Sequence, residues 1–184
     1  DGAKEIKGWS EAGCTAGQWK PVRKLDYDFS VLTGQGSGKV SLMDEVKPKE
    51  IFETPEGDLV IDFGQNMSAL IQVTATGKKG DVIRLDCFEV LDSKGNVYLD
   101  NLRGAKESLQ YTFGEDGTIT YRPSFTFMGF RYAKIVSFPG TPEPGNFIAH
   151  AIHTNMERTG FLETSNPDLN QLAHNILWGL KSNF

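Results

Sequence analysis

The sequence Leu70-Ile71-Gln72-Val73-Thr74-Ala75 has the two-residue alternation of a half-buried β-strand. Successive side chains of a strand point to opposite faces, so Ile71, Val73 and Ala75 are expected on one face of a sheet. Strand-like runs of this kind occupy residues 50–54, 59–63, 69–76, 82–91, 108–113, 118–121, 125–138 and 147–154. Turns rich in Gly, Asp and Asn separate them, and no helical pattern provides the crossover that parallel strands need. The pattern predicts a mainly β fold, an antiparallel β-sandwich or jelly roll.

The composition is that of a globular domain. The chain has 184 residues, of which 39% are hydrophobic and 23% are charged, which is enough apolar material to build a core. The net charge of -5 at pH 7 argues against nucleic acid or an anionic membrane as a partner, because both repel an acidic surface. No apolar run reaches the roughly 18 residues that a transmembrane helix needs. The start is polar and lacks an initiator Met, so we expect a processed product or an internal fragment.

The segments that flank the β region have a different character. Residues 27–32 form a strand-like run, and the Gly-rich residues 33–39 are expected to be a flexible linker. At the other end, Asn166-Pro167-Asp168 combines a capping residue, a Pro in the first helical position and an acid in the first turn. Apolar residues then recur at helical spacing, at Leu169, Leu172, Ala173, Ile176, Leu177 and Leu180. This predicts one C-terminal amphipathic helix of three or four turns, whose apolar stripe needs a partner surface.

Few residues of the sequence fit a catalytic or metal-binding motif. The odd spacing of His150 and His153 on one expected strand points them to opposite faces, so they are poor joint metal ligands. No Gly-x-Ser-x-Gly nucleophile motif occurs, and Cys14 and Cys87 are expected to be free thiols. We therefore predict no metal site and no cofactor in this chain.

Glu89 is the most unusual carboxylate of the sequence. It continues the alternation of Ile83, Leu85 and Cys87, so it is expected on an apolar face. A partly buried carboxylate needs a hydrogen-bond donor. The candidate donors are Arg84, Arg103 and Arg131. Two interpretations stay open: a structural ion pair that fixes the strand register, or a contribution to binding.

Exposed aromatic side chains offer an alternative function, a carbohydrate-binding module that acts by itself. Sugars stack on exposed rings that have hydrogen-bonding groups nearby. The candidate rings are Trp9, Trp19, Tyr98 and Tyr132, with Asn101 or Arg103 beside them. Two coplanar rings exposed to solvent would favour this function over a structural role.

Several short blocks occur in a specific order. They are Asp62-Phe63-Gly64-Gln65-Asn66-Met67-Ser68, Phe88-Glu89-Val90-Leu91-Asp92, Gly95-Asn96-Val97-Tyr98, Asn101-Leu102-Arg103-Gly104-Ala105, Phe125-Thr126-Phe127-Met128-Gly129-Phe130-Arg131-Tyr132 and Ser165-Asn166-Pro167. Each block alone is weak, but their order and spacing are specific. Over about residues 47–184, this string resembles the bacterial α-L-rhamnosidases of glycoside hydrolase family 78.

The resemblance implies a division of the chain into parts. Residues 1–45 would be the tail of a preceding β-sandwich domain plus a linker, and residues 46–140 a concanavalin-like β-sandwich. Residues 141–165 would continue the β layer, and residues 166–184 would be the first helix of an (α/α)6 catalytic barrel that follows this chain.

The resemblance also implies a function. The family hydrolyses terminal α-L-rhamnosyl linkages with inversion, using two carboxylates of the barrel. This chain would then be a non-catalytic portion of the bacterial enzyme, inactive alone, with the barrel of the same polypeptide as its partner. Carbohydrate is a further possible partner, and the substrate-binding candidates are Glu89, Asn101, Arg103 and Tyr132. The compartment stays open among cytoplasm, periplasm and secretion.

The sequence departs from the family pattern at several positions. Ala69-Leu70 stand where the family has Gly-Trp, and Cys87-Phe88 stand where it has His-Ala. Met128 replaces a His, and Leu109 replaces an Asp. These changes indicate a divergent branch of the family, whose substrate need not be rhamnose.

Overall fold

The computed structural model describes residues 1–17, 19–36 and 38–184. The strands are β1 Val40–Val46, β2 Glu50–Glu53, β3 Leu59–Gly77, β4 Val82–Phe88, β5 Val90–Leu91, β6 Val97–Tyr98, β7 Ser108–Thr112, β8 Gly117–Tyr121, β9 Met128–Ser137 and β10 Phe147–Thr154. The helices are the 3-10 turns η1 Gly2–Lys4, η2 Phe29–Val31, η3 Asp100–Leu102 and η4 Pro144–Asn146, and the α-helix α1 Pro167–Asn183. The mainly β fold with a C-terminal helix is confirmed.

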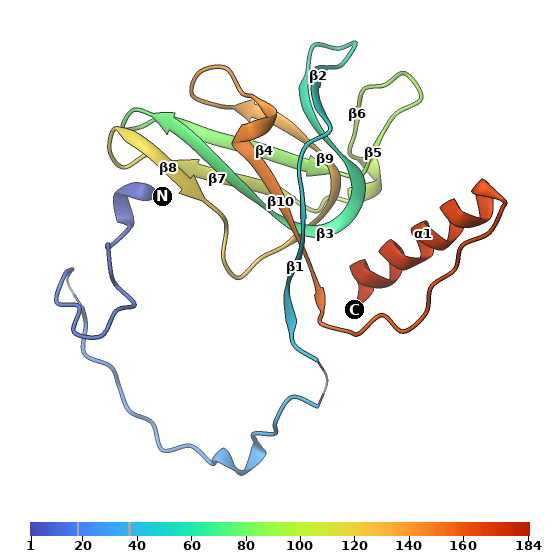
Figure 1. The fold of residues 1–184 in the computed structure, drawn as a ribbon. Coiled ribbons are helices and arrows are strands. Elements are labelled where there is room, and N and C mark those ends of the chain that lie inside the picture. Colours follow the sequence, from blue (N-terminus) through green and yellow to red (C-terminus); the bar gives the residue numbers. More distant parts are fainter. Residues whose placement is uncertain (18, 37) are drawn as a thin grey trace.

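One long strand, β3, organises the sheet. It pairs antiparallel with β2 and β9 along its first part and with β10 and β8 along its last part. Among the described residues, eight strands form one sheet in the order β1-β10-β3-β9-β4-β7, with β2 and β8 also paired to β3. β3 curves strongly, so this sheet folds over itself and forms both layers of the sandwich (Figure 1).

The bend of β3 lies at Gly64. The register of β3 against β9 shifts between Asp62 and Met67, and Gly64 has a φ of 74°. The Gly64 N–H donates a 2.6 Å hydrogen bond to Asp62 Oδ1, which closes the bend locally. Glycine adopts this left-handed conformation without the steric cost that a Cβ imposes. The prediction of separate strands at 59–63 and 69–76 is therefore wrong, because the chain bends through a glycine without leaving the sheet.

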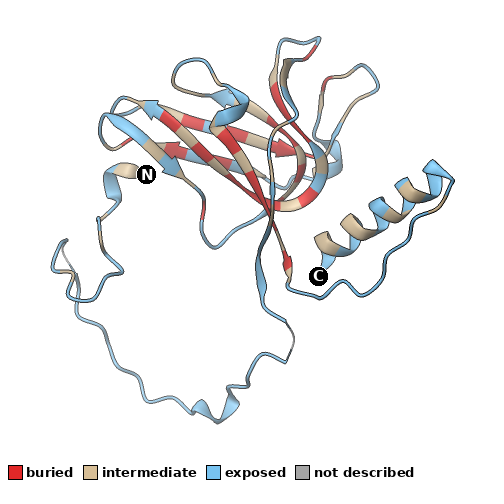
Figure 2. Ribbon diagram, viewed as in Figure 1, coloured by how far each residue is buried: buried red, intermediate tan, exposed pale blue. Residues whose placement is uncertain are grey.

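The main core lies between the two layers. As predicted, Ile71, Val73 and Ala75 share one buried face of β3. They belong to a cluster that also contains Ile61, Phe63, Met67, Ala69, Ile83, Leu85, Cys87, Leu109, Tyr111, Phe113, Met128, Phe130, Ala133, Phe147, Ala149 and Ala151. A smaller cluster of Val60, Phe88 and Tyr132 is covered by Phe52, Leu91 and Val97. Along β4 and β7, buried positions largely alternate with half-buried or exposed ones, whereas β3 also has runs of consecutive buried residues (Figure 2).

Two other predicted strands differ from those observed. The run 82–91 is interrupted at Glu89, because β4 ends at Phe88 and the chain turns into the β5–β6 hairpin. The run 125–138 starts later than predicted, at Met128. Phe125 has a φ of 63°, which no strand residue adopts, and its side chain is fully exposed. The strands β1 and β6 are not among the runs predicted from the sequence.

The N-terminal region forms an exposed arm. It leaves η1 beside β7, runs away from the sheet and returns at β1 (Figure 1). The strand predicted at 27–32 is not formed, and the 3-10 turn η2 stands there instead, capped by Asp28, whose side chain accepts a 2.9 Å bond from Ser30 N–H. A strand needs a neighbouring strand for its hydrogen bonds, and this segment has none in the described residues.

Both cysteines are free, as expected, and burial raises the pKa of the Cys87 thiol.

Helix α1 begins as the sequence predicts. The Asn166 side chain accepts a 2.9 Å hydrogen bond from Asp168 N–H, and Pro167 takes the first helical position. The helix has 17 residues, which is about one turn more than the predicted three or four at 3.6 residues per turn. The extra turn reaches Asn183, where the periodic apolar pattern has already ended.

We predict that Gly64→Ala lowers the free energy of unfolding by about 1–2 kcal/mol, because a Cβ in the left-handed region clashes with the backbone. Urea denaturation followed by circular dichroism measures the change. Gly145→Ala is the matched control: Gly145 lies in η4, has no positive φ, and has open space where its Cβ would be. Equal changes in the two variants would contradict the assignment of the bend to Gly64.

Candidate functional site

Helix α1 lies beside the bend of β3 and the end of β10 (Figure 1). Its side chain Trp178 packs against the main core. The Ser68 hydroxyl donates a 3.1 Å hydrogen bond to the carbonyl oxygen of Ser182. The Thr154 N–H donates a 2.8 Å bond to the carbonyl oxygen of Phe184. The helix therefore docks on the sheet through one indole and a set of polar contacts.

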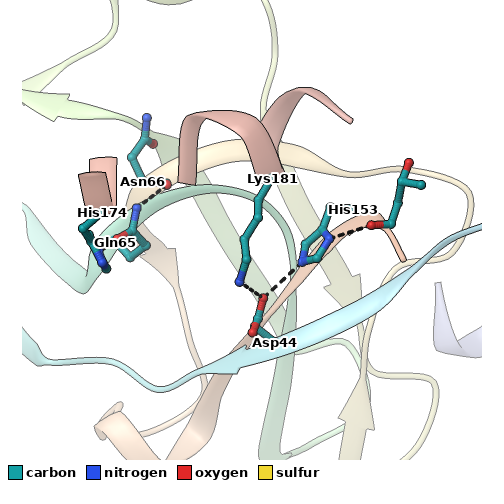
Figure 3. A network of polar contacts seen from close by, with 7 residues as sticks. Asp44, Gln65, Asn66, His153, His174 and Lys181 are labelled. Carbon is teal, nitrogen blue, oxygen red and sulfur yellow. Dashed lines mark hydrogen bonds and ion pairs between the residues drawn. The ribbon is translucent and has the colours of Figure 1, made fainter. Parts of the chain in front are cut away.

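A charged cluster fixes the last turn of α1 (Figure 3). Lys181 Nζ lies 2.7 Å from Asp44 Oδ2 of β1, and His153 Nε2 of β10 lies 3.2 Å from the same oxygen. His153 Nδ1 lies 2.9 Å from the carbonyl oxygen of Thr154. The cluster ties three elements, β1, β10 and α1, to one carboxylate.

The pKa of Asp44 reflects this cluster. Burial alone would raise the pKa of the carboxyl group, but hydrogen bonds from Lys181 and His153, together with their charges, outweigh burial and hold the pKa below its usual value. Lys181 Nζ also lies 4.5 Å from the centre of the Trp178 ring, so the ammonium group is attracted to both partners.

A groove separates the rest of α1 from the sheet. Its volume is about 460 Å³. The sheet side is formed by Gln65, Asn66, Met67, Ser68, Glu89 and Gly129, and the helix side by Asn175, Trp178, Gly179, Ser182 and Asn183. At its margin, His174 Nε2 lies 3.2 Å from Gln65 Oε1 (Figure 3). The groove is the candidate functional site of the described residues.

Glu89 borders this groove and has partners other than those expected. Asn66 Nδ2 donates to its Oε1 at 3.1 Å, and Asn101 Nδ2 donates to its Oε2 at 2.9 Å. The expected arginine donors are engaged elsewhere or exposed. Arg84 pairs with Asp86, Arg131 pairs with Asp62, and Arg103 is exposed. The strand alternation ends at Phe88, so Glu89 leaves the apolar face and is held by two amides.

The ion pair of Asp62 and Arg131 braces the bend of β3. Arg131 Nε and Nη2 donate to the two oxygens of Asp62 at 2.8 and 2.7 Å. Burial would raise the pKa of Asp62, but the bonds from Arg131 and from the Gly64 N–H outweigh it and lower the pKa. This bidentate pair was not singled out from the sequence, because the two residues lie far apart along the chain and meet only through the pairing of β3 with β9.

The substrate-binding candidates do not form one site. Glu89 and Asn101 are hydrogen-bonded to each other, and Arg103 follows in the same turn with a left-handed φ of 51°. Tyr132 pairs in register with Phe88, the residue before Glu89, but its side chain belongs to the smaller core cluster, where it is buried and stacked on Phe88 at 5.3 Å. The proximity of Glu89 and Asn101 could not be read from the sequence, because a loop returns η3 to the residue that follows β4.

The candidate aromatic rings are dispersed. Trp9 and Trp19 lie on the N-terminal arm and are exposed, and Tyr98 lies at the end of β6. Within the described ranges the one stacked aromatic pair is Phe88 and Tyr132, which is buried. The arrangement of two exposed coplanar rings that would favour a stand-alone sugar-binding module does not occur among these residues.

His150 and His153 do not share a binding site. His150 and His153 are both buried and belong to opposite faces of β10, which fits their odd spacing. Among the residues that the structure describes, no group of three or more His, Cys, Asp or Glu side chains is arranged to hold a metal ion. The described part of the chain also has no helix with the length and hydropathy of a membrane span.

Comparison with known proteins identifies the family. Residues 52–153 match the model of the bacterial alpha-L-rhamnosidase concanavalin-like domain, over more than half of the chain. The chain belongs to this domain family. The family membership expected from the sequence blocks is thereby confirmed.

The relatives align with the whole of this chain, but this chain aligns with only a small part of each relative. An alpha-L-rhamnosidase of Streptomyces avermitilis is 37% identical to this chain, and the match covers 100% of this chain and 18% of the relative. An alpha-L-rhamnosidase of Alteromonas sp. (strain LOR) is 31% identical, and the match covers 100% of this chain and 20% of the relative. The crystal structure of the Streptomyces avermitilis enzyme complexed with L-rhamnose matches with a TM-score of 0.91 over the same 100% and 18%. The crystal structure of the native enzyme from Aspergillus terreus matches with a TM-score of 0.90 and 35% identity, and the match covers 97% of this chain and 21% of that chain. The chain thus spans about a fifth of the length of these relatives.

We predict that Lys181→Met loosens α1 without unfolding the sheet. Methionine retains the apolar stem beside Trp178 but removes the charge on Asp44, a contribution of up to about 1 kcal/mol for a partly exposed pair. Hydrogen exchange should become faster in α1, by up to about fivefold, and stay unchanged in β4 and β9. Lys79→Met, in the turn between β3 and β4, is the control. Equal exchange in α1 of both variants would contradict the role of the cluster.

The same cluster predicts a pH dependence of helix docking. The folded-state pKa of Asp44 lies below its ordinary value of about 3.9. Its contribution is therefore complete above that ordinary value and is lost as the pH falls through the lower folded value. Exchange in α1 should accelerate in this acidic range, and Asp44→Asn should abolish that dependence. An unchanged acid dependence in Asp44→Asn would assign it to another group.

Proposed function

We propose that this chain is the non-catalytic β domain of a bacterial α-L-rhamnosidase and that it braces the catalytic helical barrel of the same polypeptide. The parent enzyme hydrolyses terminal α-L-rhamnosyl linkages. The family match and the relatives of known activity support this assignment. The observation that carries the bracing role is the orientation of α1.

Four residues of the predicted apolar stripe of α1, Leu169, Leu172, Ile176 and Leu180, are exposed, while Ala173 and Leu177 are half-buried. Leu172 and Ile176 are 53% and 63% exposed, although they lie at the centre of the predicted stripe. The polar side, with Lys181, Ser182 and Asn175, faces the sheet. An amphipathic helix normally buries its apolar face. The exposure of these four residues supports a second layer of helices on the outer side of α1.

The exposed apolar stripe of α1 is large enough to stabilise contact with another domain. Its exposed members are Leu169, Leu172, Ile176 and Leu180. Each buried Leu or Ile side chain contributes about 1.5–3 kcal/mol. Covering this stripe therefore offsets a substantial part of the translational and rotational entropy lost when a folded neighbouring domain docks on it. Residues 166–184 would then belong structurally to the barrel and be held in place by the β domain.

The division of the chain follows from this proposal. Residues 46–140 are the concanavalin-like sandwich, and residues 141–165 continue its β layer into the connection to α1. Residues 1–45 are the tail of a preceding β-sandwich plus a linker, whose last residues, 40–45, pair with β10 as part of β1. The exposure of Trp19, Tyr27 and Phe29 on the arm supports a further surface that covers them.

The catalytic carboxylates are proposed to lie in the barrel, so the 184-residue chain alone should release no product from an aryl α-L-rhamnoside. A polypeptide that continues through the barrel should release it. Activity of the isolated chain would contradict the proposed division of labour between β domain and barrel.

We predict that Leu172→Gln combined with Ile176→Gln lowers the melting temperature of the barrel-containing polypeptide by several degrees and reduces its activity, since two buried apolar contacts are lost. In the 184-residue chain the same change should alter the free energy of unfolding by less than about 0.5 kcal/mol, because both side chains are exposed. Leu99→Gln, an exposed leucine outside α1, is the control. If the longer polypeptide tolerates the double variant as well as the control, the stripe is not the interface.

A further inference from the structure

We propose that the groove between α1 and the bend of β3 is a binding site for a neutral, hydroxyl-rich small molecule, with the size and chemistry of one pyranose unit. This site differs from the outward stripe of α1 and does not depend on the barrel. Its volume of about 460 Å³ falls within the range of about 300–1,000 Å³ that is usual for ligand pockets.

The lining of the groove selects the class of ligand. Its polar side chains are carboxamides, hydroxyls and a single carboxylate: Gln65, Asn66, Ser68, Glu89, Asn175, Ser182 and Asn183. No Lys or Arg is among its lining residues, so an anionic ligand such as a phosphate would meet Glu89 without a compensating cation. A purely apolar ligand would leave these polar groups unsatisfied. A neutral polyol supplies both donors and acceptors to them.

Three polar side chains of the groove, Asn175, Asn183 and Glu89, are oriented by hydrogen bonds and retain capacity for others. Asn175 Oδ1 accepts from Gln171 at 2.7 Å, which leaves its amide N–H groups for a ligand. Asn183 Nδ2 donates to the carbonyl oxygen of Gly179 at 2.6 Å, which leaves its Oδ1 as an acceptor. Glu89 accepts one bond on each oxygen from Asn66 and Asn101, and each carboxylate oxygen has a second lone pair. Side chains fixed in this way lose little entropy when a ligand binds.

Two glycines leave the groove open. A Cβ built at Gly129 on β9 or at Gly179 on α1 meets no atom within 4 Å. Neither residue has a left-handed φ, so the backbone does not require glycine at these positions. Glycine inside a helix costs roughly 1 kcal/mol relative to alanine. The absence of a side chain at Gly179 therefore sacrifices helix stability and leaves space beside Trp178.

The test uses the 15N-labelled 184-residue chain, titrated separately with L-rhamnose, D-glucose and calcium chloride. We expect saturable shifts with at least one sugar, with a Kd on the order of millimolar for so small a ligand. The shifts should cluster at the side-chain amides of Asn175 and Asn183 and at the indole N–H of Trp178.

Two neighbouring substitutions make the test specific. Gly179→Gln places a side chain in the groove and should abolish the shifts while preserving or raising the melting temperature. Leu180→Gln places the same side chain on the outward stripe and should leave the shifts intact. No saturable shift with either sugar, shifts that persist in Gly179→Gln, or a response to calcium alone would each overturn the proposal. None of these outcomes bears on activity or on the stripe, so failure here is distinguishable from failure of the proposed function.

Discussion

The pairing of β3 with four neighbours is the constraint on which the rest of this structure depends. Its two ends belong to different layers of the sandwich, so the strand must bend without losing its ladder of hydrogen bonds. Gly64 provides the bend, and the bidentate ion pair of Asp62 and Arg131 braces it from the neighbouring strand. Both layers, and the core between them, are positioned by this one strand.

The bend also creates the candidate site. Residues 63–66 lie in the register shift of β3 against β9, and the polar side chains of Gln65, Asn66 and Ser68 line the groove beside α1. Asn66 reaches Glu89, Ser68 reaches the backbone of Ser182, and Gln65 reaches His174. The same irregularity that closes the sandwich thus supplies one wall of the groove and the seat of the terminal helix.

Helix α1 is held by contacts of modest strength. One indole is packed against the core, and a partly exposed carboxylate, Asp44, is shared by Lys181 and His153. Exposed ion pairs contribute little each, so docking on the β domain alone leaves the helix among the least stable parts of the fold. An apolar stripe that faces outward is consistent with a helix that a second domain completes.

Periodicity and turn chemistry in the sequence determined the fold class, the buried face of Ile71, Val73 and Ala75, and the capped start of α1 at Asn166, because these depend on residues close together along the chain. The continuity of β3, the break of β4 before Glu89 and the absence of a strand at 27–32 were decided by tertiary structure, since a strand exists only where another strand pairs with it. The partners of Glu89 and the direction in which α1 turns its apolar stripe were decided in the same way. Those contacts join residues that only the folded sheet brings within hydrogen-bonding distance.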